Sequence, residues 1–431
     1  MSRTLYTLVL RLLAPALWVW MAWRARGSSG RWEIFSRARF GCAESPSQGM
    51  DNVGRVWIHA VSLGETRAAQ SLIQALLDAG VRLLLTHTTP TGRAEGGRLF
   101  AAALATGQLR QTWLPYDFPG STGRFFRTYR PVVGVLVERE VWPNLLYQAR
   151  RADVPMVLAS ARLSASSLSQ TRWLRSALQR AYASLEMTLA QTTDDAARLL
   201  SVGAREVRVV GNMKFDIRLP SDQLEFGQNW RQALGRPVIA IASTREGEDA
   251  VFTALIAAQG DMPPDSPHAP FYLLIPRHPQ RFDAAAALLS EHGLEYWRHS
   301  QMGKELPPAN VRVLLGDTLG EMPFYYAAAD VSIIGGGFAP LGGQNLIEAC
   351  AAGTAVIVGP HMYNFAQATH DAVASGAALQ VTDAAEAISL AVSLLADDAM
   401  RCRMRGMGLA WTASHAGATA RIVQALAPWL R

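Results

Sequence analysis

Residues 57–66 read WIHAVSLGET and mark a transition from strand to helix. The apolar run at residues 56–61 predicts a strand that is buried on both faces. Glu65 then falls in the first turn of a helix that continues to residue 75. In open α/β sheets, ligands bind at the carboxyl ends of the strands. The stretch therefore predicts such a sheet and delivers an acidic side chain to its ligand-binding edge.

The same residues also fit a purely structural interpretation. Ser62 and Glu65 have the spacing of a capping box, in which the serine accepts from the backbone N–H near the glutamate and the glutamate reaches back. On these residues alone, a capping role and a functional role for Glu65 are about equally favoured.

Elsewhere, short apolar runs alternate with amphipathic segments, as in parallel sheets covered by helices. The first series of predicted strands lies at 56–61, 81–86, 132–137, 156–159, 187–190 and 207–210. The second series lies at 238–242, 271–275, 311–315, 331–334 and 355–358. The sequence thus predicts an α/β protein with two Rossmann-like domains that face each other across a cleft.

Composition indicates a globular protein with an anionic partner. A chain of 431 residues exceeds what one hydrophobic core usually supports. The net charge of +6 favours phospholipid, a phosphorylated substrate or nucleic acid as partner. The cysteines Cys42, Cys350 and Cys402 are odd in number and far apart, which is typical of a reducing compartment and disfavours structural zinc.

The N-terminus predicts an uncleaved membrane anchor. Residues 4–23 are apolar apart from Arg11, but the uncharged part, 12–23, would extend only about 18 Å as a helix. A hydrocarbon core is roughly 30 Å thick, so the anchor either lies in the interface or spans marginally. Five arginines between positions 24 and 39 favour a body on the cytoplasmic side.

Acidic residues also follow the predicted strand at 132–137. Glu138 and Glu140 are two residues apart and would project to one face. Two close carboxylates separate their pKa values, which suits acid–base chemistry. A solvated edge neutralised by Arg139 is the alternative, and this motif alone favours it.

Other polar residues of the first half are less specific. Thr89 can donate to a ligand or cap a helix that begins with Pro90. Arg162 and Lys214 each place a cation after a strand. Lone cations of this kind are more often solvated than functional.

The second half predicts a site for phosphate and ribose. Ser243 and Thr244 open a helix after a strand, a position suited to phosphate. Arg277 and His278 follow the next strand and can contact the same anion. Asn345 and Glu348 share a helix face beside the glycine-rich residues 335–337 and 342–343, where the backbone can approach a ligand closely.

Missing motifs narrow the chemistry. The sequence has no Gly-x-x-x-x-Gly-Lys, no Gly-x-Gly-x-x-Gly and no Asp-x-Asp, which disfavours ATP hydrolysis, nicotinamide redox chemistry and metal-bridged diphosphates. Its histidines lack the spacing of a zinc helix, and its basic residues lack aromatic interleaving. We expect no metal, no cofactor and no nucleic-acid partner.

Taken together, the motifs resemble those of the 3-deoxy-D-manno-octulosonic acid (Kdo) transferases of lipopolysaccharide assembly. The resemblance covers nearly the whole chain. The motifs are, in order, HAVSLGET (59–66), THTTPTG (86–92), LPYD (114–117), EREVWPN (138–144), ASARLS (159–164), NMKFD (212–216), ASTREGE (242–248), PRHPQRF (276–282), GDTLGE (316–321), GGQNLIEA (342–349) and GPHMYNF (359–365).

The resemblance implies a GT-B glycosyltransferase that moves Kdo from CMP-Kdo to a hydroxyl of the lipid A precursor, lipid IVA. It implies inversion at the anomeric centre without a metal, with Glu65 as general base. Glu138 or Glu140 would be a second acid, and Glu138 is preferred. The implied donor side consists of Ser243, Thr244, Arg277, His278, Gly316, Thr318, Glu321, Gly337, Asn345 and Glu348. On the acceptor side, or with only loosely assigned roles, are Ser62, Gly64, Thr89, Arg162 and Lys214.

The expected organisation has an anchor at 1–30, an acceptor domain at 31–216, a linker at 217–236 and a donor domain at 237–431. The last helices are candidates to pack back on the acceptor domain. The expected location is the cytoplasmic face of the inner membrane, where the phosphorylated lipid precursor would be bound. Two alternatives stay open, namely another GT-B nucleotide-sugar transferase or epimerase, and an anchored nucleotide-sugar-binding protein without catalysis.

Overall fold

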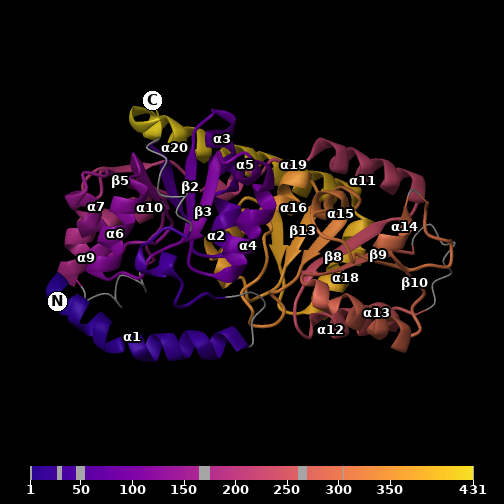
Figure 1. The fold of residues 1–431 in the computed structure, drawn as a ribbon. Helices are drawn as coiled ribbons and strands as arrows, with labels where there is room; N and C mark the ends of the chain where they lie inside the picture. The colour runs from indigo at the N-terminus through magenta and orange to yellow at the C-terminus, as the bar shows by residue number, and fades with distance from the viewer. Residues whose placement is uncertain are drawn as a thin grey trace. The chain divides into compact units, whose positions relative to one another are not determined.

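The computed structural model describes residues 2–26, 32–44, 54–164, 175–260, 269–303 and 305–430. The chain forms two compact units (Figure 1). Unit 1 consists of Met1–Asp216 and Ala416–Arg431, and unit 2 consists of Ile217–His415. The chain thus leaves unit 1 at Asp216 and returns to it at Ala416.

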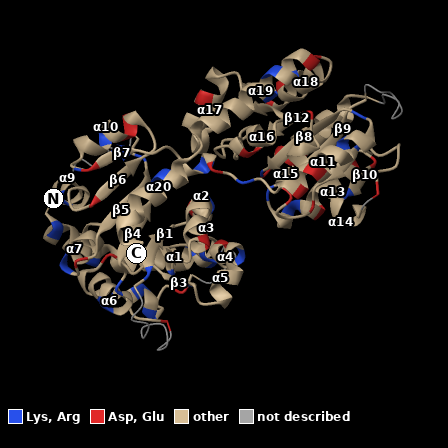
Figure 2. Cartoon of the chain, turned by 90° about the horizontal axis from the view of Figure 1, so that it is seen from above, with Lys and Arg blue, Asp and Glu red and all other residues tan. Residues whose placement is uncertain are grey.

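In the described part of unit 1, seven parallel strands form a sheet in the order β3-β2-β1-β4-β5-β6-β7. Figure 2 labels all of these strands except β2. The order reverses between β1 and β4. Strand residues of both faces are buried, as expected for a parallel sheet covered on both sides. The strands are β1 (Val56–His59), β2 (Leu83–His87), β3 (Leu109–Trp113), β4 (Val133–Val137), β5 (Met156–Ala161), β6 (Met187–Ala190) and β7 (Val207–Val209).

Helices cover this sheet, and the last of them comes from the C-terminal segment. α20 (Ala418–Leu426) lies beside α3 (Gln70–Asp78), where Ile422 and Leu426 join the core under β1 (Figure 1). The other helices of unit 1 are α1 (Arg3–Arg26), α2 (Leu63–Ala68), α4 (Pro90–Leu99), α5 (Ala101–Ala105), α6 (Pro119–Tyr129), α7 (Pro143–Arg151), α9 (Arg175–Tyr182), α10 (Thr193–Ser201) and the short turns η1 (Arg37–Phe40), η4 (Met213–Phe215) and η7 (Ala427–Trp429).

Unit 2 repeats the architecture, with described strands in the order β10-β11-β9-β8-β12-β13-β14. All pairs are parallel, and the order reverses between β8 and β12. The strands are β8 (Val238–Thr244), β9 (Phe271–Pro276), β10 (Tyr296–Arg298), β11 (Val313–Leu315), β12 (Val331–Ile334), β13 (Ala355–Val358) and β14 (Ala378–Gln380).

Part of the segment that was expected to be a linker is helical. Residues 221–234 form α11, which packs on α15 and buries Trp230 against Phe271 and Phe324. The polar residues of this segment face outward, which made it look like a linker in sequence. The other helices of unit 2 are α12 (Glu248–Ala258), α13 (Phe282–Glu291), α14 (His299–Met302), α15 (Met322–Ala327), α16 (Ile347–Ala352), α17 (Ala366–Ala374), α18 (Ala384–Leu395), α19 (Asp398–His415), η5 (Pro279–Arg281) and η6 (Tyr363–Phe365).

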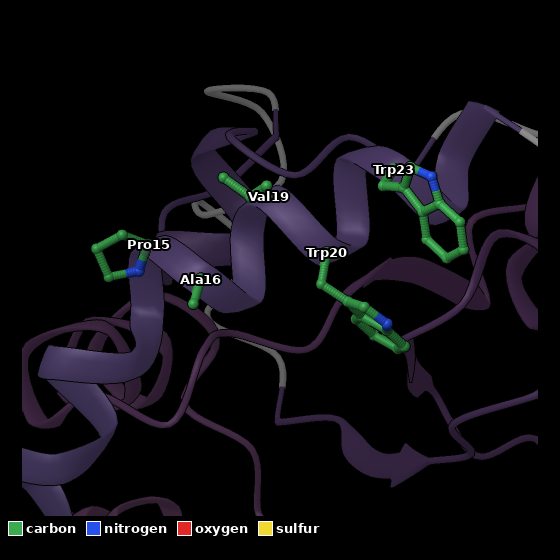
Figure 3. Close-up of a pocket in the computed structure, with 5 residues that line it drawn as sticks. All are labelled: Pro15, Ala16, Val19, Trp20 and Trp23. Atoms are coloured by element: carbon green, nitrogen blue, oxygen red, sulfur yellow. The ribbon is translucent and has the colours of Figure 1, made fainter.

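The N-terminal helix α1 is docked along unit 1 by one face. Thr7, Ala14 and Met21 are buried and recur every seven residues, so they share that face. The opposite face is exposed and apolar, with Leu12 at 72% and Val19 at 70% exposure. Figure 3 shows an apolar hollow on the outer side of the helix, lined by Pro15, Ala16, Val19, Trp20 and Trp23. Within the described ranges, α1 is the one helix long and apolar enough to cross a membrane.

Candidate active site and sugar-nucleotide site

The carboxyl ends of β1 and β4 carry the candidate acids of unit 1. The two strands pair in parallel, with His59 opposite Leu136. The loops that follow them therefore begin side by side. Glu65 lies in the first turn of α2, just after β1, and Glu138 and Glu140 lie just after β4. This is the point where the strand order reverses, which is where open α/β sheets bind ligands.

Glu65 forms the predicted helix cap and has an unusual pKa. Its backbone N–H lies 3.5 Å from Ser62 Oγ, and its Oε2 accepts from the Val61 N–H at 2.5 Å. The backbone N–H groups of Val61 and Ser62 lower the pKa of the carboxyl group. Burial and the charges of Glu140 and Glu138 outweigh them and raise the pKa of Glu65 to about 7. The residue is therefore a helix cap that also titrates near neutral pH.

Glu138 is held by cations from two other loops. Its Oε2 lies 2.9 Å from Arg162 Nε, and its Oε1 lies 2.9 Å from Lys214 Nζ. Burial opposes ionisation of Glu138, but Lys214 and Arg162 keep its pKa below the ordinary value. Its backbone adopts the left-handed region, with φ of 61°. The structure therefore brings the loosely assigned Arg162 and Lys214 together on Glu138, which stays ionised.

Glu140 has different partners. Its Oε2 accepts from the indole N–H of Trp142 at 2.8 Å and lies 3.8 Å from His59 Nε2. The Glu140 charge acts on Glu65 more strongly than the Glu138 charge does. The preference for Glu138 in the sequence analysis rested on the motif alone, whereas electrostatics couple Glu140 more strongly to Glu65.

The remaining acceptor-side candidates shape the loops. Thr89 caps α4, because its Oγ1 accepts from the Gly92 N–H at 3.2 Å, and it also donates to the Val61 carbonyl at 3.1 Å. The predicted capping role of Thr89 is confirmed. Gly64 is exposed, and a Cβ there would meet only Ser62 Oγ at 3.9 Å. Packing in this unit does not explain a glycine at that position.

Asp117, the last residue of the LPYD motif but not one of the predicted site residues, supports the loop that contains Glu140. It is buried at the start of α7, where its carboxylate accepts from the N–H groups of Asn144 at 3.1 Å and Leu145 at 2.6 Å. It also accepts from the Tyr6 hydroxyl of α1 at 2.9 Å. Burial raises the pKa of Asp117 to about 7 against these donors. One carboxyl group thus joins α1 to the end of the EREVWPN loop.

In unit 2, the carboxyl ends of β8 and β12 carry the predicted phosphate and glycine loops. A Cβ on Gly335 would lie 2.8 Å from Thr244 Cα and 2.9 Å from the Ser243 carbonyl oxygen. A side chain is therefore excluded where the two loops meet. A Cβ on Gly337 would lie 2.8 Å from Met362 Sδ, so that glycine also serves close packing. Ser243 and Thr244 are the last residues of β8, and α12 begins only at Glu248, so the prediction that they open a helix is wrong. Ser243 adopts the left-handed backbone region, with φ of 60°.

Glu248 organises both loops and was missed by the sequence analysis. Its buried carboxylate accepts from the N–H groups of Arg245 at 2.8 Å, Gly336 at 2.6 Å and Phe338 at 2.9 Å. These backbone donors would otherwise form an anion-binding nest. Glu248 fills the nest, so side chains rather than these N–H groups are left to meet a ligand phosphate. The first-turn position of Glu248 in α12 was its one signal in the sequence.

Cationic side chains gather beside this loop. Arg277 donates from Nε to Gln344 Oε1 at 3.2 Å. Burial and the neighbouring charges of Arg277 and Arg245 lower the pKa of His278. The positive charges of both arginines therefore act on His278.

Glu348 lies in the first turn of α16, whereas Asn345 lies before that helix, so the predicted shared helix face is wrong. Asn345 Oδ1 accepts from the N–H of Ile347, the first residue of α16, at 3.1 Å. Burial, followed by the charge of Glu348, raises the pKa of Tyr326, whereas Arg277 lowers it. Glu348 and Arg277 are thus near neighbours of the same tyrosine.

Gly316, Thr318 and Glu321 form a separate group after β11. Thr318 Oγ1 lies 3.0 Å from both His299 Nδ1 and the Tyr325 hydroxyl, and His299 Nδ1 lies 3.2 Å from Glu321 Oε2. A Cβ on Gly316 would lie 3.0 Å from the Tyr325 ring. The three residues therefore meet around Tyr325, next to Tyr326 on α15.

No group of three or more His, Cys, Asp or Glu side chains with the geometry of a metal site occurs in the part of the chain that the structure describes. Glu138 is paired with arginine and lysine side chains, Glu140 contacts tryptophan and histidine side chains, and Glu65 accepts from a backbone N–H.

Comparisons with known proteins agree with this architecture. The family profile of 3-deoxy-D-manno-octulosonic-acid transferase (kdotransferase) matches residues 35–217. The chain is 59% identical over 430 residues to the 3-deoxy-D-manno-octulosonic acid transferase of Bordetella pertussis, and the match covers 100% of each chain. It is 31% identical to that of Haemophilus influenzae, over 87% of each chain. Among solved structures, UDP-GlcNAc 2-epimerase from Neisseria meningitidis bound to UDP-GlcNAc covers 87% of this chain and matches over 100% of its own length, with a TM-score of 0.56 and 15% identity.

In the described part of the chain, two parallel seven-stranded sheets with helices on both faces, together with this structural neighbour, define the fold as GT-B. The full-length identity is more specific. The chain belongs to the family of 3-deoxy-D-manno-octulosonic acid transferases and is a glycosyltransferase.

Proposed function

We propose that this chain transfers Kdo from CMP-Kdo to the lipid A precursor lipid IVA, with inversion at the anomeric carbon, without a metal ion, and with Glu65 as general base. The observation that carries the proposal is a carboxyl group with a pKa near 7 at the carboxyl end of β1, beside two further acids. A base with a pKa near the working pH is the most effective kind.

In the proposed reaction, Glu65 accepts the proton of an acceptor hydroxyl while the hydroxyl oxygen attacks the anomeric carbon of Kdo. The bond from that carbon to the CMP phosphate oxygen breaks, and CMP leaves with the electron pair. Glu138 contributes fixed charge rather than proton transfer, because Arg162 and Lys214 keep it ionised.

The donor would be held by unit 2. Arg277 and His278 supply charge and hydrogen bonds for the phosphate, and Ser243 and Thr244 adjoin them at the end of β8. Glu348 is the candidate for the ribose hydroxyls. Gly316, Thr318 and Glu321 complete the donor side around Tyr325. Glu248 acts indirectly, since it fixes the loop that contains Gly336.

The body would be held at the cytoplasmic face of the inner membrane by α1. The exposed apolar face of α1 supports this location, as do Arg24 and Arg26 in its last turn. A docked helix whose outer face is apolar fits the membrane interface better than a span.

The test uses the purified full-length protein with CMP-Kdo and lipid IVA, and mass spectrometry of the lipid product. We expect Kdo addition, inhibition by CMP and no inhibition by UDP. Glu65→Gln should lower the rate by about 10² to 10⁴, whereas Glu206→Gln, an exposed acid of the same unit, should not. Full activity of Glu65→Gln would remove the proposed base, and inhibition by UDP would indicate a different donor.

A further inference from the structure

His59 is a fully buried histidine beneath the candidate acids, and the proposed reaction does not use it. It is the last residue of β1 and has 0% exposure. Its Nε2 has no hydrogen-bond partner among the described residues, although a buried polar atom is normally paired. The nearest charged oxygen is Glu140 Oε2 at 3.8 Å. The ring nitrogen thus faces a carboxylate across a gap slightly longer than a hydrogen bond.

We assign the tautomer from the contacts of the other ring nitrogen. His59 Nδ1 lies 3.1 Å from the Thr86 carbonyl oxygen and 2.9 Å from Thr86 Oγ1. Because the carbonyl oxygen can only accept, we assign the proton to Nδ1. Thr86 Oγ1 already accepts from the Trp57 indole N–H at 2.8 Å. In the neutral ring, Nε2 is therefore the nitrogen without a proton, and its lone pair points toward a carboxylate.

A lone pair that faces a carboxylate is repulsive unless a proton lies between them. We propose that His59 and Glu140 hold one shared proton, and that this pair controls the negative charge next to Glu65. His59 is thus a positioning residue, which acts on the reaction through Glu140. The inference rests on the proposed role of Glu65 as base. Contacts of this kind are often long in the absence of substrate and tighten when it binds.

The other charged and titratable side chains around Glu65 have a fixed charge state, so we assign the control of the charge next to Glu65 to the His59–Glu140 pair. Glu138, the other acid that acts on Glu65, is held ionised by Arg162 and Lys214, so its charge is fixed. On the β2 side, burial and the charges of His59 and Arg93 lower the pKa of His87 to about 3, so His87 stays neutral. Its Nδ1 contacts the Ala60 carbonyl at 2.9 Å. Glu140, which lies opposite His59 Nε2, is therefore the remaining acid that acts on Glu65.

The proposal predicts opposite effects for two substitutions. In His59→Asn, the amide can still donate to Thr86, but the nitrogen that faces Glu140 is gone. The Glu140 charge is then uncompensated, and the acid limb of the rate–pH profile should move up by roughly one pH unit, which lowers the rate below the limb about tenfold. In Glu140→Gln the charge is removed, and the limb should move down.

The experiment measures the maximal transfer rate against pH for the wild type, His59→Asn, Glu140→Gln and the double variant. The double variant should follow the profile of Glu140→Gln, because His59 acts only through Glu140. His59→Gln, whose amide reaches toward the position of Nε2, should shift the limb less than His59→Asn. An unmoved limb in His59→Asn, or additive shifts in the double variant, would overturn the inference.

Folding and the assignment of the base are controlled separately. Thermal unfolding of each variant identifies loss of structure, and Thr86→Val, which removes the hydroxyl contact but keeps the carbonyl, should leave the limb in place. If wild-type protein transfers no Kdo from CMP-Kdo, the proposed function fails. If it does so with an acid limb that His59→Asn leaves unmoved, only the role of His59 fails.

Discussion

Glu65 combines a structural and a chemical role in one side chain. As a cap it accepts from the Val61 N–H, which on its own would lower its pKa. Burial and two neighbouring acids reverse that effect and raise the pKa to about 7. The sequence predicted both the cap and an acid at this strand end. It could not predict the pKa, because the acids responsible lie about 75 residues away along the chain.

The raised pKa of Glu65 makes this residue costly for stability. A carboxyl group that binds its proton more tightly in the folded state stabilises the fold below its unfolded pKa, and this contribution is lost as pH rises through the folded pKa. We therefore expect Glu65→Gln to become more stable than the wild type as pH rises from about 4 to 8, by up to about 2 kcal/mol. Thermal unfolding across this range is the measurement, and a difference that is constant with pH would contradict the expectation.

Glu138 should behave in the opposite way. Its lowered pKa contributes stability that is present above the unfolded pKa and is lost as pH falls through the folded pKa. Glu138→Gln also leaves Arg162 and Lys214 without their carboxylate, and should cost about 1 to 3 kcal/mol at neutral pH. Denaturant unfolding checks this value, with Glu186→Gln, another acid of unit 1, as the control. A loss that is equal at low and neutral pH would be inconsistent with the ion pairs.

At the scale of elements, the strands that are buried in the middle of a sheet were predictable from the sequence, because they form continuous apolar runs. Every predicted strand is present within a few residues of its expected ends. The strands without a prediction, β3, β10 and β14, are all sheet edges. β3 contains Arg110, Gln111 and Thr112, and such polar residues hide the apolar run that marks a central strand. Helix α11 was missed for a related reason, since one buried tryptophan holds an otherwise polar helix.

The two faces of α1 should separate folding from membrane binding. Tyr6→Phe removes the hydroxyl that bonds to Asp117 and should destabilise unit 1 by about 1 to 3 kcal/mol. Replacement of Leu12 and Val19 by Ser on the exposed face should leave stability within about 0.5 kcal/mol. In a flotation assay, a smaller fraction of the serine variant should bind to anionic vesicles, whereas Tyr6→Phe should bind to them like the wild type. The reverse result would mean that the outward face of α1 is not the membrane face.

At the scale of the whole molecule, the chain crosses from one unit to the other and returns. Asp216 ends the first passage through unit 1, and its carboxylate accepts from the N–H groups of Gly417 and Thr419 at the start of the last. Sequence patterns identified two Rossmann-like halves, because each half has its own series of apolar runs. The contact that closes unit 1 joins residues about 200 positions apart, and no local pattern encodes it.

Removal of residues 416–431 should therefore damage the distant half of the chain. The truncation exposes the apolar positions under β1 that Ala418, Ile422 and Leu426 cover. Each buried aliphatic side chain lost costs about 2 to 5 kcal/mol. We expect a lower unfolding temperature for unit 1 and an unchanged unfolding temperature for unit 2. Hydrogen exchange of the backbone amides in β1 and in β12 measures the two units separately. Loss of protection in β12 first would contradict this assignment.

The carboxyl group of Asp117 makes a specific contact between the N-terminal helix and the rest of unit 1. Because Tyr6 and the backbone of the EREVWPN loop share this acceptor, the helix is not an interchangeable tether. A chimera that carries an unrelated hydrophobic helix would reach the bilayer but leave a buried oxygen unmatched beneath the loop that positions Glu140. Exchange of the N-terminal helix between relatives should preserve the fold of unit 1 only when Tyr6 and Asp117 are exchanged as a pair.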